Sequence, residues 1–332
     1  MFHIPKCVFF CGALATLLCA SSGYSDSTQP PPHKKEEPLP WLTGPLLTPS
    51  AHVIPKWHFN IEPYEFATSN YGVYNKEWKA VSSPHNLYNI QTSIPIQCGL
   101  PAHFDFVFTP QWSWNHIKGA SHWVLNDMPF AFDYQIVARK RHDWYPTVKL
   151  TVRANFPFGK YQKLNAHSKG TDVGGAGSWL PGVGLTMSHL VHISGPVFLS
   201  PRVYIQYTIP TPVHVRGANV YGGGHRTRGT AFPGQQLLTQ LGLELSLPLH
   251  FALACDIQYQ HCNKDRFKGR KGRTLGIPNV IAPPSSEQLI IAPAVEYNWS
   301  AYYGVIAGAQ FTAAGRNAGQ LASGIVAINI YH

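Results

Sequence analysis

The sequence predicts an all-β protein, a transmembrane antiparallel up-and-down β-barrel of about 12 strands. The first observation is strict alternation in residues 102–114, AHFDFVFTPQWSW. Most even-numbered residues of this stretch are aromatic, and most odd-numbered residues are polar; we call these two sets the apolar and the polar parity of the strand. This period of two indicates a strand, because successive strand residues point to opposite faces. The second observation is that short and long connections alternate along the chain, as they do in bacterial outer-membrane barrels. The third is that the polar parity repeatedly carries charged residues, which a soluble core would bury at high cost.

The N-terminal region has the features of a secretory signal followed by a leader. Lys6 precedes an apolar run from Cys7 to Ala20, and small residues follow, so residues 1–25 are expected to be a signal peptide. Residues 26–55 are rich in proline and show little apolar periodicity, so we expect an exposed periplasmic leader. The barrel is then expected to occupy residues 56–332, and no segment approaches the 18 consecutive apolar residues of a transmembrane helix.

Candidate strands follow one another from residue 57 to the C-terminus. Their expected ranges are 57–67, 87–98, 102–114, 128–138, 146–158, 182–192, 196–209, 236–248, 250–262, 287–298, 300–312 and 322–331. Long connections, expected on the outer side of the membrane, are 68–86, 115–127, 159–181, 210–235 and 263–286. Pro95, Pro201 and Pro293 weaken the pattern, because each removes a donor from the hydrogen-bond ladder and a closed barrel has no free edge.

Charged residues on the polar parity are the candidate pore-lining set. In a barrel whose apolar face meets lipid, these side chains point into the lumen, where they can be hydrated or paired. One interpretation is a constriction of mixed charge that selects solutes, and the alternative is a network of ion pairs that fills a narrow barrel. The candidates are Asp105, Asp133, Lys149, Arg153, Arg202, Glu244, Asp256 and Glu296.

A basic loop, NKDRFKGRKGR at residues 263–273, is the main feature outside the strands. One interpretation is contact with the phosphates of lipopolysaccharide, for which arginine forks are well suited. A merely solvated loop is the alternative, and nucleic acid is excluded because the chain is exported and no stacking platform accompanies the charge. The lipopolysaccharide-contact candidates are Lys264, Arg266, Lys268, Arg270, Lys271 and Arg273.

Neither a cofactor nor a metal site is expected. Cys98, Cys255 and Cys262 lack metal-binding spacing, and whether any of them forms a disulfide stays open. Ser188 and His189 are adjacent on one strand and point to opposite faces, so they do not make a nucleophile and its base. We therefore expect no enzymatic activity and no catalytic residues.

A family resemblance is carried by LTGPLLTPS at residues 42–50 and by HFNIEPYEF at residues 58–66. A Gly-Leu turn at Gly99 and a glycine-rich stretch near 174–184 extend it through most of the mature length. With these motifs the chain resembles the bacterial outer-membrane family named after the meta-pathway of phenol degradation. The resemblance implies an outer-membrane barrel that passes small compounds, aromatic ones included, and it identifies no phenol-specific residues.

Three functions remain after these arguments. The first is a passive outer-membrane channel for small solutes, hydrophobic or aromatic ones included. The second is a structural or adhesive surface barrel without transport, and the third is an outer-membrane lipid hydrolase. The expected location is the bacterial cell outer membrane, and the expected partners are its lipid, lipopolysaccharide and the barrel-assembly machinery.

Overall fold

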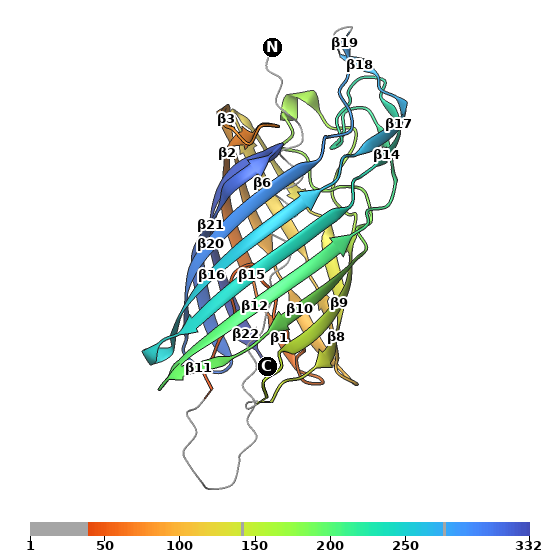
Figure 1. Cartoon of the computed structure of the whole chain (residues 1–332). Helices are drawn as coiled ribbons and strands as arrows, with labels where there is room; N and C mark the ends of the chain where they lie inside the picture. The colour runs from red at the N-terminus through yellow and green to blue at the C-terminus, as the bar shows by residue number, and fades with distance from the viewer. Residues whose placement is uncertain (1–38, 141–142, 275–276) are drawn as a thin grey trace.

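A computed structural model describes residues 39–140, 143–274 and 277–332, so the predicted signal peptide and residues 26–38 lie outside the described residues. The fold is a closed antiparallel β-barrel of 12 strands (Figure 1), which confirms the predicted fold class. The only helical elements in this part of the chain are the short 3-10 turns η1 (Ala166–Ser168) and η2 (Pro248–His250). No helix among the described residues is long and apolar enough to cross a membrane.

Several barrel strands consist of two segments. These are β1 (Phe59–Ile61) with β2 (Tyr64–Tyr74), β3 (Ala80–Ser93) with β4 (Ile96–Leu100), β5 (Phe104–Phe108) with β6 (Gln111–Ile117), β7 (Ala120–Leu125) with β8 (Met128–Val137), and β10 (Gly182–Ser188) with β11 (Val191–Ser194). The others are β9 (Thr147–Phe156), β12 (Val197–Thr208), β15 (Gln236–Ser246), β16 (Phe251–Cys262), β20 (Ser286–Asn298), β21 (Tyr303–Arg316) and β22 (Ala318–Tyr331). Each predicted range overlaps one of these strands. The barrel closes where β22 pairs with both β1 and β2.

A line of prolines explains why the first four barrel strands are interrupted. Pro63, Pro95 and Pro110 each stand at the break between two segments, and Pro129 lies just after the break in the fourth strand. Proline has no backbone N–H, so each position loses a ladder bond. The breaks are adjacent, and the remaining donors use the proline carbonyls: Glu62 N–H donates to Pro95 O at 3.1 Å and Ile94 N–H to Pro110 O at 3.0 Å. The closed wall thus accommodates these prolines by aligning their breaks.

The barrel has apolar side chains outside and polar side chains inside. Leu243 and Ile328, on the predicted lipid-facing parity, are exposed, whereas the neighbouring Glu244 is fully buried. The same alternation of exposed and buried residues runs along β16, where Leu253 and Ile257 are exposed, and along β20 and β22. A soluble barrel would have the opposite polarity, so this inverted arrangement fits a wall surrounded by lipid.

The two ends of the barrel differ, as the predicted loop lengths require. Short turns join strands at the end that holds η2 and the C-terminal residue, and long connections gather at the opposite end (Figure 1). Two predicted loops are shorter than expected, because β2 and β3 extend to a turn at residues 75–79 and β7 occupies residues 120–125. The longest connections carry strands of their own: β13 (Val213–Arg216), β14 (Arg228–Phe232), β17 (Arg266–Arg270), β18 (Arg273–Thr274) and β19 (Ile277–Pro278).

Substituting Leu243→Arg tests the orientation of the wall. Leu243 is 39% exposed on the outer face of β15, and arginine near the bilayer midplane is expected to cost about 2–4 kcal/mol of folding free energy. Unfolding of the barrel in lipid bilayers, followed by heat-dependent gel mobility, measures this cost. Leu249→Arg in the turn η2 is the control, because Leu249 is 80% exposed beyond the strand ends. Equal stability of both variants would contradict a lipid-facing Leu243.

Candidate functional site

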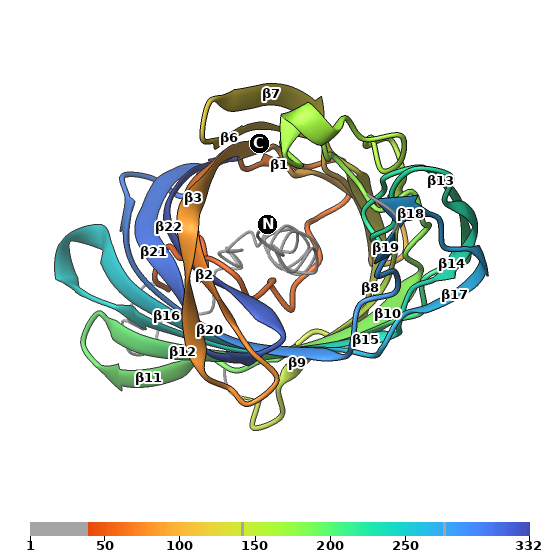
Figure 2. The same ribbon diagram turned by 90° about the horizontal axis from the view of Figure 1, so that it is seen from above.

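The lumen contains a segment of the chain itself. Residues 39–55, here called the inner segment, pass through the interior of the ring of strands (Figure 2). Leu46, Leu47 and Thr48 are completely buried there. This differs from the expectation that the whole leader is exposed. The physical reason is that these residues find matching apolar and polar partners on the inner wall, and a short run without periodicity does not reveal such partners in the sequence.

Apolar contacts hold the middle of the inner segment. Leu46 and Leu47 pack in one buried cluster with inward-facing side chains of β2, β16, β20, β21 and β22, namely Tyr64, Phe66, Ala254, Ile290, Ala292, Ala294, Ile306, Ile325 and Ala327. Two glycines on this wall leave the space that the segment occupies. A Cβ at Gly242 would lie 2.7 Å from Pro45 Cγ, and one at Gly308 would lie 2.8 Å from Leu46 Cδ1. This side of the lumen is therefore apolar and closely fitted to the segment.

Asp256 is the main polar anchor of the inner segment. Its Oδ2 accepts a hydrogen bond from Leu47 N–H at 3.0 Å, and its Oδ1 accepts from Thr48 N–H at 3.0 Å and from the Thr48 hydroxyl at 2.6 Å. Asp256 points inward from β16 and is fully buried. Hydrogen bonds to a charged acceptor are the strong ones, so one carboxylate holds the segment at its most buried point.

Two glutamates bind the start of the segment. Glu296 of β20 accepts from Thr43 N–H, and Glu244 of β15 accepts from Gly44 N–H at 2.9 Å. The other oxygen of Glu244 accepts from Arg202 Nη2 of β12 at 2.9 Å, in a buried ion pair. These carboxylates thus bind backbone N–H groups of the segment and do not simply cancel the basic residues of the wall.

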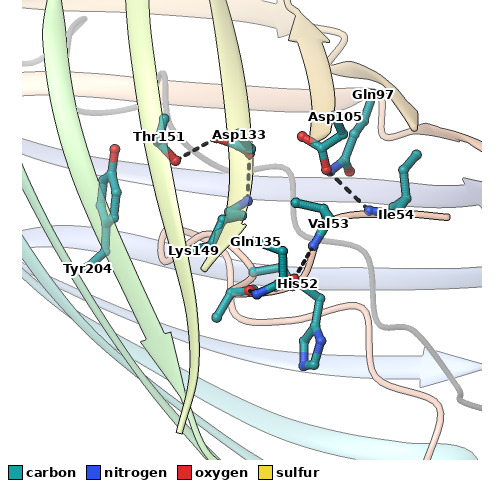
Figure 3. Close-up of polar contacts among 12 residues, drawn as sticks. His52, Val53, Ile54, Gln97, Asp105, Asp133, Gln135, Lys149, Thr151 and Tyr204 are labelled. Atoms are coloured by element: carbon teal, nitrogen blue, oxygen red, sulfur yellow. Dashed lines mark hydrogen bonds and ion pairs between the residues drawn. The ribbon is translucent and has the colours of Figure 1, made fainter. Parts of the chain in front are cut away.

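The end of the segment is held on the opposite wall (Figure 3). Val53 N–H donates to Gln135 Oε1 at 2.8 Å, and Ile54 N–H donates to Asp105 Oδ2 at 3.2 Å. Asp105 also accepts from Gln97 Nε2. Both contacts lie close to the short-turn end, just before the chain enters β1.

Lys149 and Asp133 form a second buried ion pair on the inner wall. Lys149 Nζ lies 2.7 Å from Asp133 Oδ2, and Thr151 donates to the other Asp133 oxygen at 2.5 Å (Figure 3). Asp105 and Asp133 are cross-strand partners, so Lys149 stands beside two adjacent acids. We call these buried charged residues of the inner wall the charged ring: Asp105, Asp133, Lys149, Arg202, Glu244, Asp256 and Glu296.

All eight pore-lining candidates are therefore buried on the inward parity. Arg153 stands apart from the ring, two inward positions beyond Lys149 on β9, where its Nη1 donates to Gln206 Oε1 at 3.2 Å. That any of the eight lines a path for solute remains a prediction.

Glutamines form a second level that the sequence analysis did not single out. Gln240, Gln258, Gln260, Gln288 and Gln310, here called the glutamine girdle, point inward from β15, β16, β20 and β21 and are buried. They lie on the long-loop side of the inner segment. The alternation along their strands predicts that they point into the lumen, but an uncharged amide gives no signal of function in the sequence.

The hydrogen bonds that the described residues supply to the girdle are incomplete. Gln240 Nε2 donates to Gln258 Oε1 at 2.6 Å, and Gln288 Nε2 donates to Thr312 Oγ1 at 3.1 Å. Other buried amide atoms have no hydrogen-bond partner among the described residues, including Gln240 Oε1, Gln258 Nε2, Gln288 Oε1 and both polar atoms of Gln310. Leaving such groups unpaired in a dry interior is costly, so this level of the lumen is suited to water or a polar solute.

Replacing Asp256 tests the anchor. Asp256→Ala removes an acceptor of three hydrogen bonds and is expected to weaken attachment of the inner segment by about 3 kcal/mol, a shift of about a hundredfold toward release. Asp256→Asn keeps one oxygen acceptor, so its inner segment should be attached less strongly than in the parent and more strongly than in Asp256→Ala. Open-channel noise and mean conductance in planar bilayers should rise in the order parent, Asn, Ala. Identical recordings from all three would contradict an anchoring role.

The described residues contain no group of three or more His, Cys, Asp or Glu side chains placed to hold a metal. Cys98 and Cys255 are free thiols, and Cys255 lies on the same strand, β16, as Cys262.

Comparison with known proteins bears on the fold. No family model and no curated relative matches the sequence. Among solved structures, an outer membrane channel from Pseudomonas putida F1 aligns with a TM-score of 0.65 at 10% identity, covering 85% of this chain and 98% of that one. The β domain of the Bordetella autotransporter BrkA aligns at 0.46 and 9% identity, covering 83% and 99%. The CymD monoaromatic hydrocarbon channel aligns at 0.39 and 7% identity, covering 84% and 89%. The chain therefore shares its barrel fold with an outer membrane channel.

Proposed function

We propose that this chain is an outer-membrane channel for passive passage of small solutes, hydrophobic or aromatic ones included. We also propose that it belongs to the meta-pathway phenol-degradation family that its LTGP and EPY motifs resemble. The inverted polarity of the wall supports a place in the bilayer, and the bacterial outer membrane is where closed barrels with short turns at one end and long loops at the other reside.

The glutamine girdle carries this proposal. A barrel with a purely structural role is expected to satisfy its buried polar groups internally. Here, within the part of the chain that the structure describes, the amides of Gln258, Gln288 and Gln310 have buried atoms without a hydrogen-bond partner. Uncharged donors and acceptors can bind water or a neutral solute in passing without holding an ion strongly, which suits conduction.

The two walls of the lumen favour an amphiphilic solute. On one side, Ala292, Ala294 and Ile306 belong to the apolar cluster that Leu46 and Leu47 cover. On the other side stand polar residues such as Gln97, Gln135 and Thr151. A small molecule with an apolar ring and one polar group matches this pair of surfaces, provided that the inner segment moves aside.

Charged substitutions in the glutamine girdle test whether ions pass through this part of the lumen. Gln258→Lys and Gln258→Glu should shift the reversal potential across a KCl gradient in opposite directions, toward anion and cation preference respectively, because the side chain would stand in the conducting lumen. Ser82→Lys and Ser82→Glu are the matched controls, since Ser82 is exposed on the hairpin of β2 and β3 at the long-loop end. Those controls should leave the reversal potential nearly unchanged.

A structural surface barrel without transport is the second candidate. The buried inner segment favours it, because Leu46, Leu47 and Thr48 are completely buried in the lumen and the last two bind Asp256. If neither the purified parent barrel nor the two Gln258 variants conduct ions in planar bilayers, the transport proposal fails in favour of this alternative.

A further inference from the structure

We infer that the small sheet β13–β14–β17 is a binding site for the phosphate groups of lipopolysaccharide in the outer leaflet. The sheet lies at the long-loop end, and Figure 2 shows its strands outside the ring of barrel strands. This location brings it to the height and the side at which lipid headgroups surround a barrel.

Strand register sorts the side chains of the sheet onto two faces. Val213, Val215 and Ala231 are buried on one face, in a cluster with Tyr221 and Ile281. The opposite face, here called the basic face, is exposed and carries Arg216, Arg228, Arg266, Lys268 and Arg270. The apolar cluster fixes the sheet to the loops beneath it, so the cations are presented on a preorganised support.

Three arginines stand directly abreast on this face. Arg216 is the cross-strand partner of Arg228, and Arg228 is the cross-strand partner of Arg270. Neighbouring strands are about 4.8 Å apart, so the guanidinium groups form one short row. Like charges directly opposite each other destabilise a sheet, and an anion bound across the row would remove that repulsion.

No acidic group in the described ranges 39–140, 143–274 and 277–332 neutralises the row. The three strands contain no Asp or Glu, and within the described part of the chain none of the five cations forms an ion pair. The nearest acid in sequence, Asp265, is turned inward, where its Oδ1 accepts a hydrogen bond from Gly234 N–H at 2.7 Å. The five cations are therefore available to an external anion.

The geometry of the row favours phosphate. Arginine forks bind phosphate oxygens in pairs, and adjacent arginines can bind one phosphate or two neighbouring ones. In the outer leaflet, lipopolysaccharide is the lipid that presents several phosphates close together beside a barrel. Of the six candidates in the basic loop, three share the basic face, namely Arg266, Lys268 and Arg270. The other three, Lys264, Lys271 and Arg273, lie outside the three strands. Arg216 and Arg228 come from the connection 210–235 and were not among the six candidates.

A triple substitution tests the site. The full barrel with Arg216→Gln, Arg228→Gln and Arg270→Gln should bind bis-phosphorylated lipid A at least about tenfold more weakly than the parent in a detergent-based binding assay. The matched control replaces Lys76, Lys79 and Lys118 by Gln, which removes equal charge from exposed positions at the same end of the barrel. This control should change the affinity by less than about twofold.

The ligands compared in the assay identify what the sheet recognises. Parent binding should weaken when lipid A lacks its phosphates, and inorganic phosphate should compete only at high concentration. Equal losses in both triple variants would overturn the proposal in favour of nonspecific charge. Equal binding of phosphatidylglycerol vesicles would overturn it in favour of general attraction to anionic lipid, and unchanged binding by the test variant would exclude the sheet.

Discussion

Replacing residues 43–51 by a glycine–serine linker of equal length is expected to raise single-channel conductance several-fold. In the intact chain this stretch fills the lumen beside the apolar cluster and uses Asp256, Glu244 and Glu296 as anchors. A linker without these side chains keeps the chain length and loses the packing of Leu46 and Leu47. Water and ions then reach the carboxylates that the segment covers. Planar-bilayer recordings at fixed salt measure the change.

The same replacement should make the channel prefer cations. Among the eight candidates, acidic side chains outnumber Lys149, Arg153 and Arg202, and the inner segment no longer masks them. Gly242→Leu is an independent route to the same result, because a side chain there would collide with Pro45 and Thr48. If both variants fold and neither changes conductance or ion preference, the inner segment does not control a path.

Removing the buried ammonium group at position 149 is expected to cause the largest loss of stability. Lys149→Met leaves Asp133 and its cross-strand neighbour Asp105 without the cation that stands beside them. Breaking a buried pair by removing one partner costs about 3–5 kcal/mol, because an uncompensated charge remains. Denaturant unfolding of the reconstituted barrel measures this loss.

Two further variants show whether the stability cost of Lys149→Met comes from burial of the unpaired carboxylate or only from the loss of a positive charge. Adding Asp133→Asn to Lys149→Met should recover much of the stability, since the double variant carries one buried carboxylate fewer. Lys160→Met breaks another Lys–Asp pair, with 2.6 Å between Lys160 Nζ and Asp172 Oδ2, but Lys160 is half exposed. Its cost should be about 1 kcal/mol or less. Equal costs for the two lysine substitutions would mean that water screens the Lys149 pair as well.

Prediction from sequence succeeded wherever alternation carries the information. The stretch at residues 102–114 proved to be β5 and β6, and the charged positions Glu244, Asp256 and Glu296 are indeed inward and buried. It missed the interruption at Pro110, because aligned breaks depend on which strands are neighbours. It also missed the glutamine girdle, since the inward position of an amide gains meaning only from the amides on adjacent strands.

The sequence by itself determined the strand number, the side of each strand that faces lipid and the asymmetry of the two ends. These properties depend on local periodicity and loop length, which are written along the chain. Only the tertiary structure decided that residues 39–55 lie inside the barrel, that Glu244, Asp256 and Glu296 bind their backbone, and that Arg216, Arg228 and Arg270 are cross-strand neighbours. The physical reason is that such contacts join residues far apart in sequence, so they exist only once the strand register has closed the wall.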